Sequence, residues 1–151
     1  MVLEYASVVW TPHYEIHIKR IESIQRSFIR FALRKLQWKD PHNLPPYRDR
    51  CQLIDIQELE NRRKCSSLLF VFDVLHGKID SPTLLQRFQF KIPQRFLRSS
   101  ELLHCNYHRT NYGRAEPISY LSRLVNGCTH FDFHITHDQF KRLLKNYTEF
   151  K

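Results

Sequence analysis

Polymerases and nucleases use clustered carboxylates to hold two metal ions about 4 Å apart. The seven aspartates of this chain are scattered along the sequence, and no two of them are adjacent. The glycine-rich loop that binds phosphates in P-loop proteins and the Gly-x-Ser-x-Gly turn of serine hydrolases are both absent. Because no motif of these kinds is present, we predict that the chain has no catalytic residues of its own.

A group of histidines and cysteines in the second half of the chain is the next candidate for chemistry. Four such side chains would suit a tetrahedral zinc ion. However, a compact zinc knuckle needs two cysteines close together, and the four cysteines here are far apart. In the alternative that we favour, Cys105 and Cys128 are small buried hydrophobic residues and the histidines line a polar surface. We therefore predict no metal and no cofactor. A zinc ion would draw its ligands from His104, Cys105, His108, Cys128, His130, His134 and His137.

Basic residues form a ridge on one side of a predicted helix. Between residues 19 and 35 there are six basic residues and one acidic residue, Glu22. A solvated helix face normally mixes charges of both signs, which form pairs at i,i+4 spacing, and this face mostly does not. A solvated face and a phosphate-binding face both fit, and we favour phosphate binding. The residues predicted to bind nucleic acid are Lys19, Arg26, Arg30 and Arg34.

The segment from His104 to Arg114 is a second candidate for nucleic-acid binding. Its basic side chains, Arg109 and Arg114 among them, alternate with two tyrosines. Cationic and aromatic side chains together suit contacts to a nucleic-acid backbone and stacking on bases or sugars. In the other interpretation the segment is a simple connection, with Gly113 as its turn residue. The sequence does not favour either interpretation.

Net charge and composition limit the class of partner. The chain has a formal net charge of +9 and aromatic residues make up 13% of it, which is more than disordered segments contain. A basic protein of this kind suits a polyanion, with nucleic acid as the first choice and an anionic membrane surface as the second. The sequence has no apolar run of about 20 residues, the length needed to cross a membrane. We also expect reduced thiols and an intracellular location, because the cysteines show no disulfide pattern.

The basic ridge from Lys19 to Arg34 requires a long helix. Thr11 and Pro12 are typical of a helix start, as N-cap and first helical residue, and the helical pattern continues to about Leu36. The three prolines between residues 38 and 46 then predict a loop. We expect the helix to bury one broad apolar stripe, which comprises Ile18, Ile21, Phe28, Phe31, Ala32 and Leu36.

The remaining elements are also predicted to be helical. Asp55 with Glu58 resembles a capping box that opens a helix ending near Gly77, and the apolar stretch 68–75 should form the centre of the core. A short helix over 83–88, one that begins at Glu116-Pro117 and ends at Gly127, and a last one capped by Thr136 and Gln139 should follow. The last helix should carry an apolar stripe that ends at Tyr147. The fold class is therefore mainly α, an irregular bundle of about five or six helices with long polar connections.

Several segments, taken in order, resemble one family. They are similar to the region after the catalytic palm in non-LTR (LINE-like) retrotransposon reverse transcriptases, with the closest likeness to the Jockey-type transposable elements of insects. No single segment is decisive, but their order and spacing are fairly specific, and together they span nearly the whole chain. They include residues 3–12 (LEYASVVWTP), 18–26 (IKRIESIQR), 75–80 (LHGKID), 108–113 (HRTNYG) and 128–133 (CTHFDF).

The resemblance implies that this chain belongs to an RNA-directed DNA polymerase whose metal-binding aspartates lie upstream of the matching region. Residues 1–80 would form a thumb-like helical region and residues 81–151 a C-terminal extension, which together make one truncated unit. Helical thumbs bind the primer–template duplex, so the expected partners are RNA or an RNA–DNA hybrid and the remainder of the reverse transcriptase. The expected location is the nucleus or cytoplasm, with no membrane partner. The alternative is a helical protein-interaction module, or an inactive relic, without nucleic-acid binding.

Overall fold

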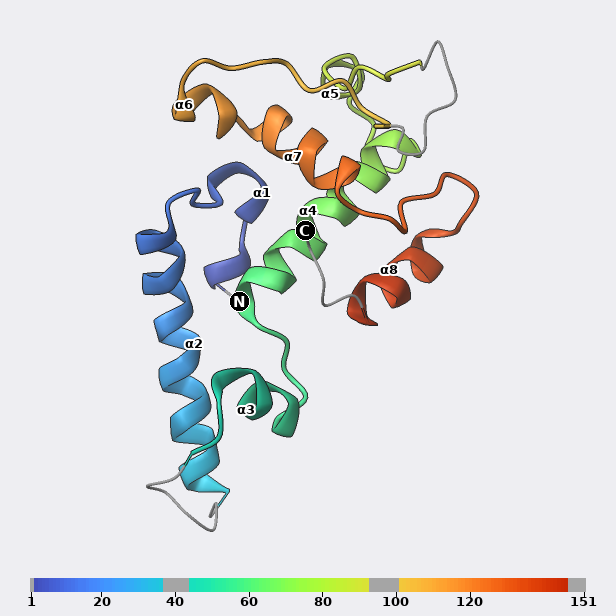
Figure 1. Cartoon of the computed structure of the whole chain (residues 1–151). Coiled ribbons are helices and arrows are strands. Elements are labelled where there is room, and N and C mark those ends of the chain that lie inside the picture. Colours follow the sequence, from blue (N-terminus) through green and yellow to red (C-terminus); the bar gives the residue numbers. More distant parts are fainter. Residues whose placement is uncertain (1, 37–43, 93–100, 147–151) are drawn as a thin grey trace. The chain divides into compact units, whose positions relative to one another are not determined.

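The computed structural model describes residues 2–36, 44–92 and 101–146, and the elements in these ranges are helices joined by loops (Figure 1). Eight α-helices lie in the described ranges, five of them with seven or more residues, and there is no strand among them. The only β-type pairing described is an isolated bridge between Phe90 and Leu103. The predicted all-helical fold is confirmed. Most of the predicted loop over 38–46, and Tyr147 of the last predicted stripe, lie outside the described residues.

The chain forms two compact units. Unit 1 comprises Met1–Tyr5 and Thr11–Arg63, and unit 2 comprises Ala6–Trp10 and Lys64–Lys151. One boundary between the two units lies between Arg63 and Lys64, within helix α4 (Leu59–Leu75). The expected division into a thumb-like region over 1–80 and an extension over 81–151 stays a prediction.

Unit 1 contains a short 3-10 helix (Val2–Glu4), the long helix α2 (Glu15–Lys35), α3 (Tyr47–Leu53) and the start of α4. Helix α2 begins after Tyr14, whose backbone is extended and whose side chain makes no capping hydrogen bond. The prediction that Thr11 is the N-cap was therefore wrong by three residues. The carbonyl of Tyr14 accepts the first helical hydrogen bonds, from the backbone N–H groups of His17 and Ile18.

The buried face of α2 differs from the predicted stripe. Glu22, Gln25, Ile29 and Leu33 are the buried residues of the helix, and Ile29 and Leu33 pack against Cys51 of α3. The prediction that Phe28, Phe31 and Leu36 belong to a buried stripe was wrong. They are 55%, 58% and 69% exposed, respectively. The reason is that the two buried polar residues of α2 find hydrogen-bond partners on α3 and at the start of α4, which removes the cost of burying them.

The N-terminus of α4 is capped by a residue distant in sequence. The Glu22 carboxylate accepts hydrogen bonds from the backbone N–H groups of Leu59 at 3.0 Å and Glu60 at 3.2 Å. A carboxylate at this position satisfies two free N–H groups and lies favourably in the helix dipole. The predicted capping role of Asp55 was wrong, because Asp55 lies four residues before α4 in a left-handed conformation with φ 54°.

Unit 2 contains α1 (Ser7–Trp10), the rest of α4, α5 (Pro82–Leu85), α6 (Asn111–Arg114), α7 (Pro117–Asn126) and α8 (His137–Asn146). The predicted start of α7 at Glu116-Pro117 is confirmed. The capping box of α8 is also confirmed. The Thr136 N–H donates to the Gln139 side chain at 2.9 Å, and the Gln139 N–H donates to the Thr136 hydroxyl at 3.4 Å. Helix α5 ends at Leu85, so it is shorter than the predicted helix over 83–88.

The core of unit 2 is built on the second half of α4, as predicted. Leu68, Val71 and Phe72 are buried there against α7 and α8. The Phe72 ring stacks on Phe140 of α8, with ring centroids 4.8 Å apart. Gly77 follows α4 with φ 70°, the left-handed conformation expected of a glycine that ends a helix.

Candidate nucleic-acid interface

The predicted basic ridge lies on α2 in unit 1. All four of its residues are exposed. Arg26, Arg30 and Arg34 follow one another at i,i+4 spacing, so they lie on the same side of the helix. With a rise of about 1.5 Å per residue, they extend over roughly 12 Å along the helix axis. The structure therefore brings these three guanidinium groups into one row, and Lys19 lies two turns before Arg26.

The four ridge residues differ in their surroundings. The Lys19 amine pairs with Glu15 at 2.8 Å, and this hydrogen bond and charge lower the pKa of the Glu15 carboxyl. The Arg26 guanidinium lies over the Tyr47 ring, 4.7 Å from its centroid. The side chains of Arg30 and Arg34 make no hydrogen bond or ion pair with any residue that the structure describes. These two arginines are consequently the ridge residues whose charge is most available to a ligand.

A buried polar network fixes the orientation of α2. The Tyr47 hydroxyl donates to Glu22, and the Gln25 side-chain amide donates to the Tyr47 oxygen at 3.0 Å and to the Gln57 carbonyl at 2.9 Å. Arg62 donates to the Gln25 side-chain oxygen and pairs with Glu4 at 2.9 Å. Rotation of α2 about its axis would break these bonds and leave buried polar groups without partners, which is costly.

This network was missed by the sequence reasoning. The hydrogen bonds of the network join residues of α2 to residues of α3 and around the start of α4 that are 22 to 38 positions away, so no local pattern contains them. One signal was available in the spacing of Glu22, Gln25, Ile29 and Leu33, which is 3, 4 and 4 and describes one helix face. The prediction of the buried face of this helix followed the apolar residues Phe28 and Phe31 instead.

Arg109 and Arg114, the other two predicted binding residues, lie in unit 2 and are exposed. Arg109 precedes α6, and Arg114 is the last residue of α6, where its backbone carbonyl accepts a hydrogen bond from the Arg123 guanidinium. Tyr107 and Tyr112 are 93% and 87% exposed, so their rings are available for stacking. The structure thus places four predicted residues on one helix of unit 1 and two in a different unit.

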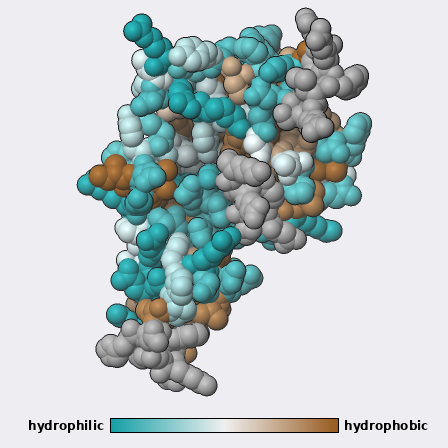
Figure 2. Space-filling view, viewed as in Figure 1, coloured by the Kyte–Doolittle hydropathy of each residue, from teal (hydrophilic) through white to brown (hydrophobic). Residues whose placement is uncertain are grey.

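An apolar surface also lies on α2. Ile24, Phe28 and Phe31, spaced 4 and 3 residues apart, form an exposed apolar stripe. Beside it, Leu3 and Ile56 complete a pocket of about 210 Å³, which Gln25 and Arg62 also line. Figure 2 shows one face of the molecule, on which hydrophilic residues predominate and hydrophobic residues form small separate patches.

The histidines and cysteines described in unit 2 do not gather at one site. Within the described ranges, no group of three or more His, Cys, Asp or Glu side chains is placed to hold a metal ion. Cys128 is buried in the core, and the Cys105 sulfur accepts a hydrogen bond from the Asn126 side chain at 3.3 Å. None of the described helices is long and apolar enough to cross a membrane.

The chain was compared with family models, with curated proteins and with solved structures, and no match was found in any of the three comparisons. The relationship to non-LTR reverse transcriptases therefore stays a prediction that depends on the sequence segments alone.

Proposed function

We propose that this chain is a non-catalytic, nucleic-acid-binding part of a retrotransposon RNA-directed DNA polymerase, and that it binds RNA or an RNA–DNA hybrid through the ridge of α2. The observation that supports this most strongly is the row formed by Arg26, Arg30 and Arg34, which the buried network on the same helix holds toward solvent. In this proposal the polymerase reaction belongs to a palm region outside the matching segment. Such a role places the protein in the nucleus or cytoplasm.

The chemistry of the ridge favours phosphate groups. Guanidinium groups donate paired hydrogen bonds to phosphate oxygens, and contacts of this kind position a protein on nucleic acid without reading its sequence. The net charge of +9 supplies long-range attraction to the same partner. If about six phosphates are neutralised, the logarithm of the binding constant should fall with the logarithm of salt concentration with a slope near −5.

The proposal is tested by measuring anisotropy while the chain is titrated into a labelled RNA–DNA hybrid. We expect the double variant Arg30→Glu/Arg34→Glu to lose at least about 100-fold in affinity at low salt, because two phosphate contacts become repulsive. The matched control is Lys141→Glu/Arg142→Glu, which makes the same change in net charge at exposed residues of α8. Equal loss in both variants would contradict the proposal, since net charge alone would then explain the binding.

A second candidate function, docking of a protein partner, is favoured by the exposed stripe of Ile24, Phe28 and Phe31 and its adjoining pocket. Apolar helix faces of this kind bind partner helices through residues at i, i+4 and i+7 spacing. This candidate predicts association that persists at high salt and is lost in Phe28→Ser/Phe31→Ser. Light scattering after size-exclusion chromatography at several salt concentrations would distinguish it from nucleic-acid binding, which weakens with salt.

A further inference from the structure

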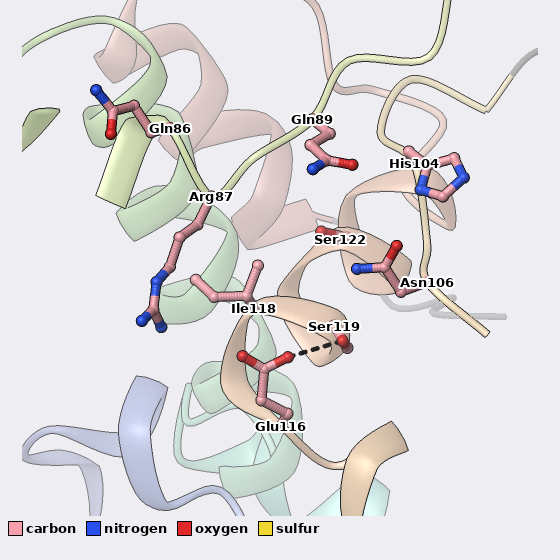
Figure 3. Close-up of a pocket in the computed structure, with 9 residues that line it drawn as sticks. All are labelled: Gln86, Arg87, Gln89, His104, Asn106, Glu116, Ile118, Ser119 and Ser122. Carbon is pink, nitrogen blue, oxygen red and sulfur yellow. Dashed lines mark hydrogen bonds between the residues drawn. The ribbon is translucent and has the colours of Figure 1, made fainter. Parts of the chain in front are cut away.

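Unit 2 contains a polar pocket that neither of these functions uses. It has a volume of about 370 Å³ and lies among the segment after α5, the segment before α6 and the first two turns of α7 (Figure 3). A volume of about 300–1,000 Å³ is typical of small-ligand sites. The lining side chains are mostly amides, hydroxyls and charged groups, with Ile118 as the apolar exception. The pocket is therefore suited to a ligand rich in hydrogen-bonding groups.

Several side chains of this pocket have unused hydrogen-bonding capacity. Arg87, Gln89 and Asn106 make no side-chain hydrogen bond to any residue in the described ranges. Glu116 has one oxygen engaged, because its Oε2 accepts from the Ser119 hydroxyl at 2.9 Å. Arg87 and Glu116 form no ion pair with each other within the described part of the chain. A cation, a carboxylate and two amides thus remain available to one ligand.

The Glu116 carboxylate is held in position by a chain of contacts. His108 Nε2 lies 2.8 Å from the Ser119 hydroxyl, and because that hydroxyl donates to Glu116, the imidazole must donate to Ser119. His108 in turn packs against Gly113, where an added Cβ would lie 2.8 Å from His108 Nδ1. A residue larger than glycine would displace the imidazole. Gly113 and His108 are therefore positioning residues for this pocket.

The mixture of charges excludes simple ligands. Glu116 would repel an anion such as a phosphate group, and Arg87 would repel a simple cation. An apolar ligand would take both groups out of water without providing a partner, which is unfavourable. In the view of Figure 3, Ile118 lies between Arg87 and Asn106, where it offers an apolar surface to a flat ring. A neutral, planar ligand with both donors and acceptors on its edges meets all of these conditions, and a nucleobase has this chemistry.

Among the bases, guanine fits the available groups best. Its O6 and N7 acceptors are the preferred partners of an arginine, here Arg87, and its N1–H and N2–H groups can donate to a carboxylate, here Glu116. Adenine presents a donor where guanine has O6, so it would offer the arginine one acceptor, N7, where guanine offers two. We propose that the pocket of unit 2 binds an unpaired guanine base of a nucleic-acid strand. This inference rests on the proposed nucleic-acid binding and adds base selectivity to it.

The test uses the full chain and labelled oligouridylates of 12 residues that carry G, A, C or U at one central position. Because their phosphates are identical, differences in affinity measure base recognition alone. We expect about tenfold tighter binding of the strand with G. Glu116→Gln should abolish this preference, while its side-chain carbonyl still accepts from Ser119. Asp80→Asn, an equal charge change at an exposed residue of the same unit, should leave the preference intact.

The outcomes separate this inference from the proposed function. Arg30→Glu/Arg34→Glu should weaken binding of all four strands while the G preference persists. Four equal affinities in the unmodified chain would overturn the guanine site and leave the proposed function standing. If no strand binds, the proposed function depends on the titration with the RNA–DNA hybrid alone, and calorimetric titration with guanosine, which carries no phosphate, tests the pocket. Binding of guanosine that Asn106→Ala and Glu116→Gln both weaken would support the site, and no heat above that for uridine would overturn it.

Discussion

The two units of this chain achieve stability in different ways. Among the residues that the structure describes, the buried apolar cluster of unit 1 consists of Ile29, Leu33 and Cys51, and beside it lies the network of buried polar groups around Glu22. In the described part of unit 2, eleven residues are buried in one apolar cluster that includes the stacked rings of Phe72 and Phe140. Unit 2 is therefore specified mainly by close packing, whereas unit 1 depends on hydrogen bonds between particular atoms.

The difference bears directly on function. A network of hydrogen bonds fixes the rotation of a helix more strictly than apolar contacts do, because a small rotation leaves buried donors and acceptors without partners. In unit 1 this constraint holds α2, the helix that carries the ridge. The residues that stabilise unit 1 and the residues proposed to bind phosphate thus occupy adjoining faces of one helix.

The largest effect on stability is expected from the packed core of unit 2. Phe140 is fully buried, and Phe140→Ala should lower the free energy of unfolding by about 3–5 kcal/mol, because the lost ring leaves a cavity. Urea unfolding followed by circular dichroism would measure the change. Leu143→Ala on the same helix is the control, since Leu143 is 41% exposed and should cost much less. A similar loss of unfolding free energy in both variants would contradict close packing around Phe140.

A smaller effect is expected from the network of unit 1. Glu22→Ala removes the acceptor of the Tyr47 hydroxyl and of two backbone N–H groups, so it should lower the free energy of unfolding by about 1–3 kcal/mol. Glu15→Ala on the same helix should cause no measurable change, because Glu15 is exposed. Should Glu22→Ala prove as harmless as its control, hydrogen bonding would not be what specifies unit 1.

Alkaline pH should test the same network. Burial raises the pKa of the Tyr47 hydroxyl, and the Glu22 carboxylate raises it further. Because the folded-state pKa exceeds the unfolded value of about 10, the contribution of the neutral hydroxyl is complete below about pH 10 and is lost as the pH rises above it. Tyr47→Phe should cost about 1 kcal/mol at neutral pH and reduce the fall in stability above pH 10.

Urea unfolding at a series of pH values would measure this difference between Tyr47→Phe and the unmodified chain. Tyr112→Phe is the control, since that ring is 87% exposed. Parallel pH profiles for Tyr47→Phe and the unmodified chain would show that Tyr47 does not titrate in a buried site.

The smallest effect is expected in the reactivity of two thiols, which would report the unfolding of each unit separately. Burial, with a further contribution from nearby Cys128, raises the pKa of the Cys65 thiol to about 11, and burial also raises the pKa of Cys51. Both thiols should therefore react slowly with iodoacetamide at pH 8 until the surrounding unit unfolds. Pulsed alkylation along a urea titration, read by mass spectrometry, would report unit 1 through Cys51 and unit 2 through Cys65. Fast labelling of the buried Cys51 or of the partly buried Cys65 without urea would contradict the raised pKa of that thiol.

The features that were predicted correctly depend on local chemistry. The start of α7 at Pro117, the capping box of Thr136 and Gln139, and the buried stretch around Leu68 to Val74 can each be read from neighbouring residues. At these sites a proline fixes its own backbone angle or a capping box closes within four residues, and no distant residue competes. The same two signals failed at Thr11-Pro12 and at Asp55 with Glu58, where α2 begins three residues later and Glu22 caps α4 instead.

The features that were missed depend on partners distant in sequence. Glu22 is buried because Tyr47 and Leu59, 25 and 37 residues away, provide its hydrogen bonds. Rules that place apolar residues inside therefore assigned Phe28 and Phe31 to the core, and these residues are exposed. For the same reason the polar pocket of unit 2 was not predicted, because Arg87 and Glu116 come from separate segments of the chain. The ridge was located correctly on α2, and its nucleic-acid binding stays a prediction.

The most direct test of the central claim is the salt dependence of binding to an RNA–DNA hybrid, measured for the unmodified chain and for Arg30→Glu/Arg34→Glu. If the ridge contacts phosphates, the unmodified chain should give a slope near −5, and the variant a slope that is shallower by about 2, because two contacts are lost. Circular dichroism should show equal helix content for both proteins. Equal slopes for two folded proteins would contradict the account, since the ridge would then be a solvated face without a role in binding.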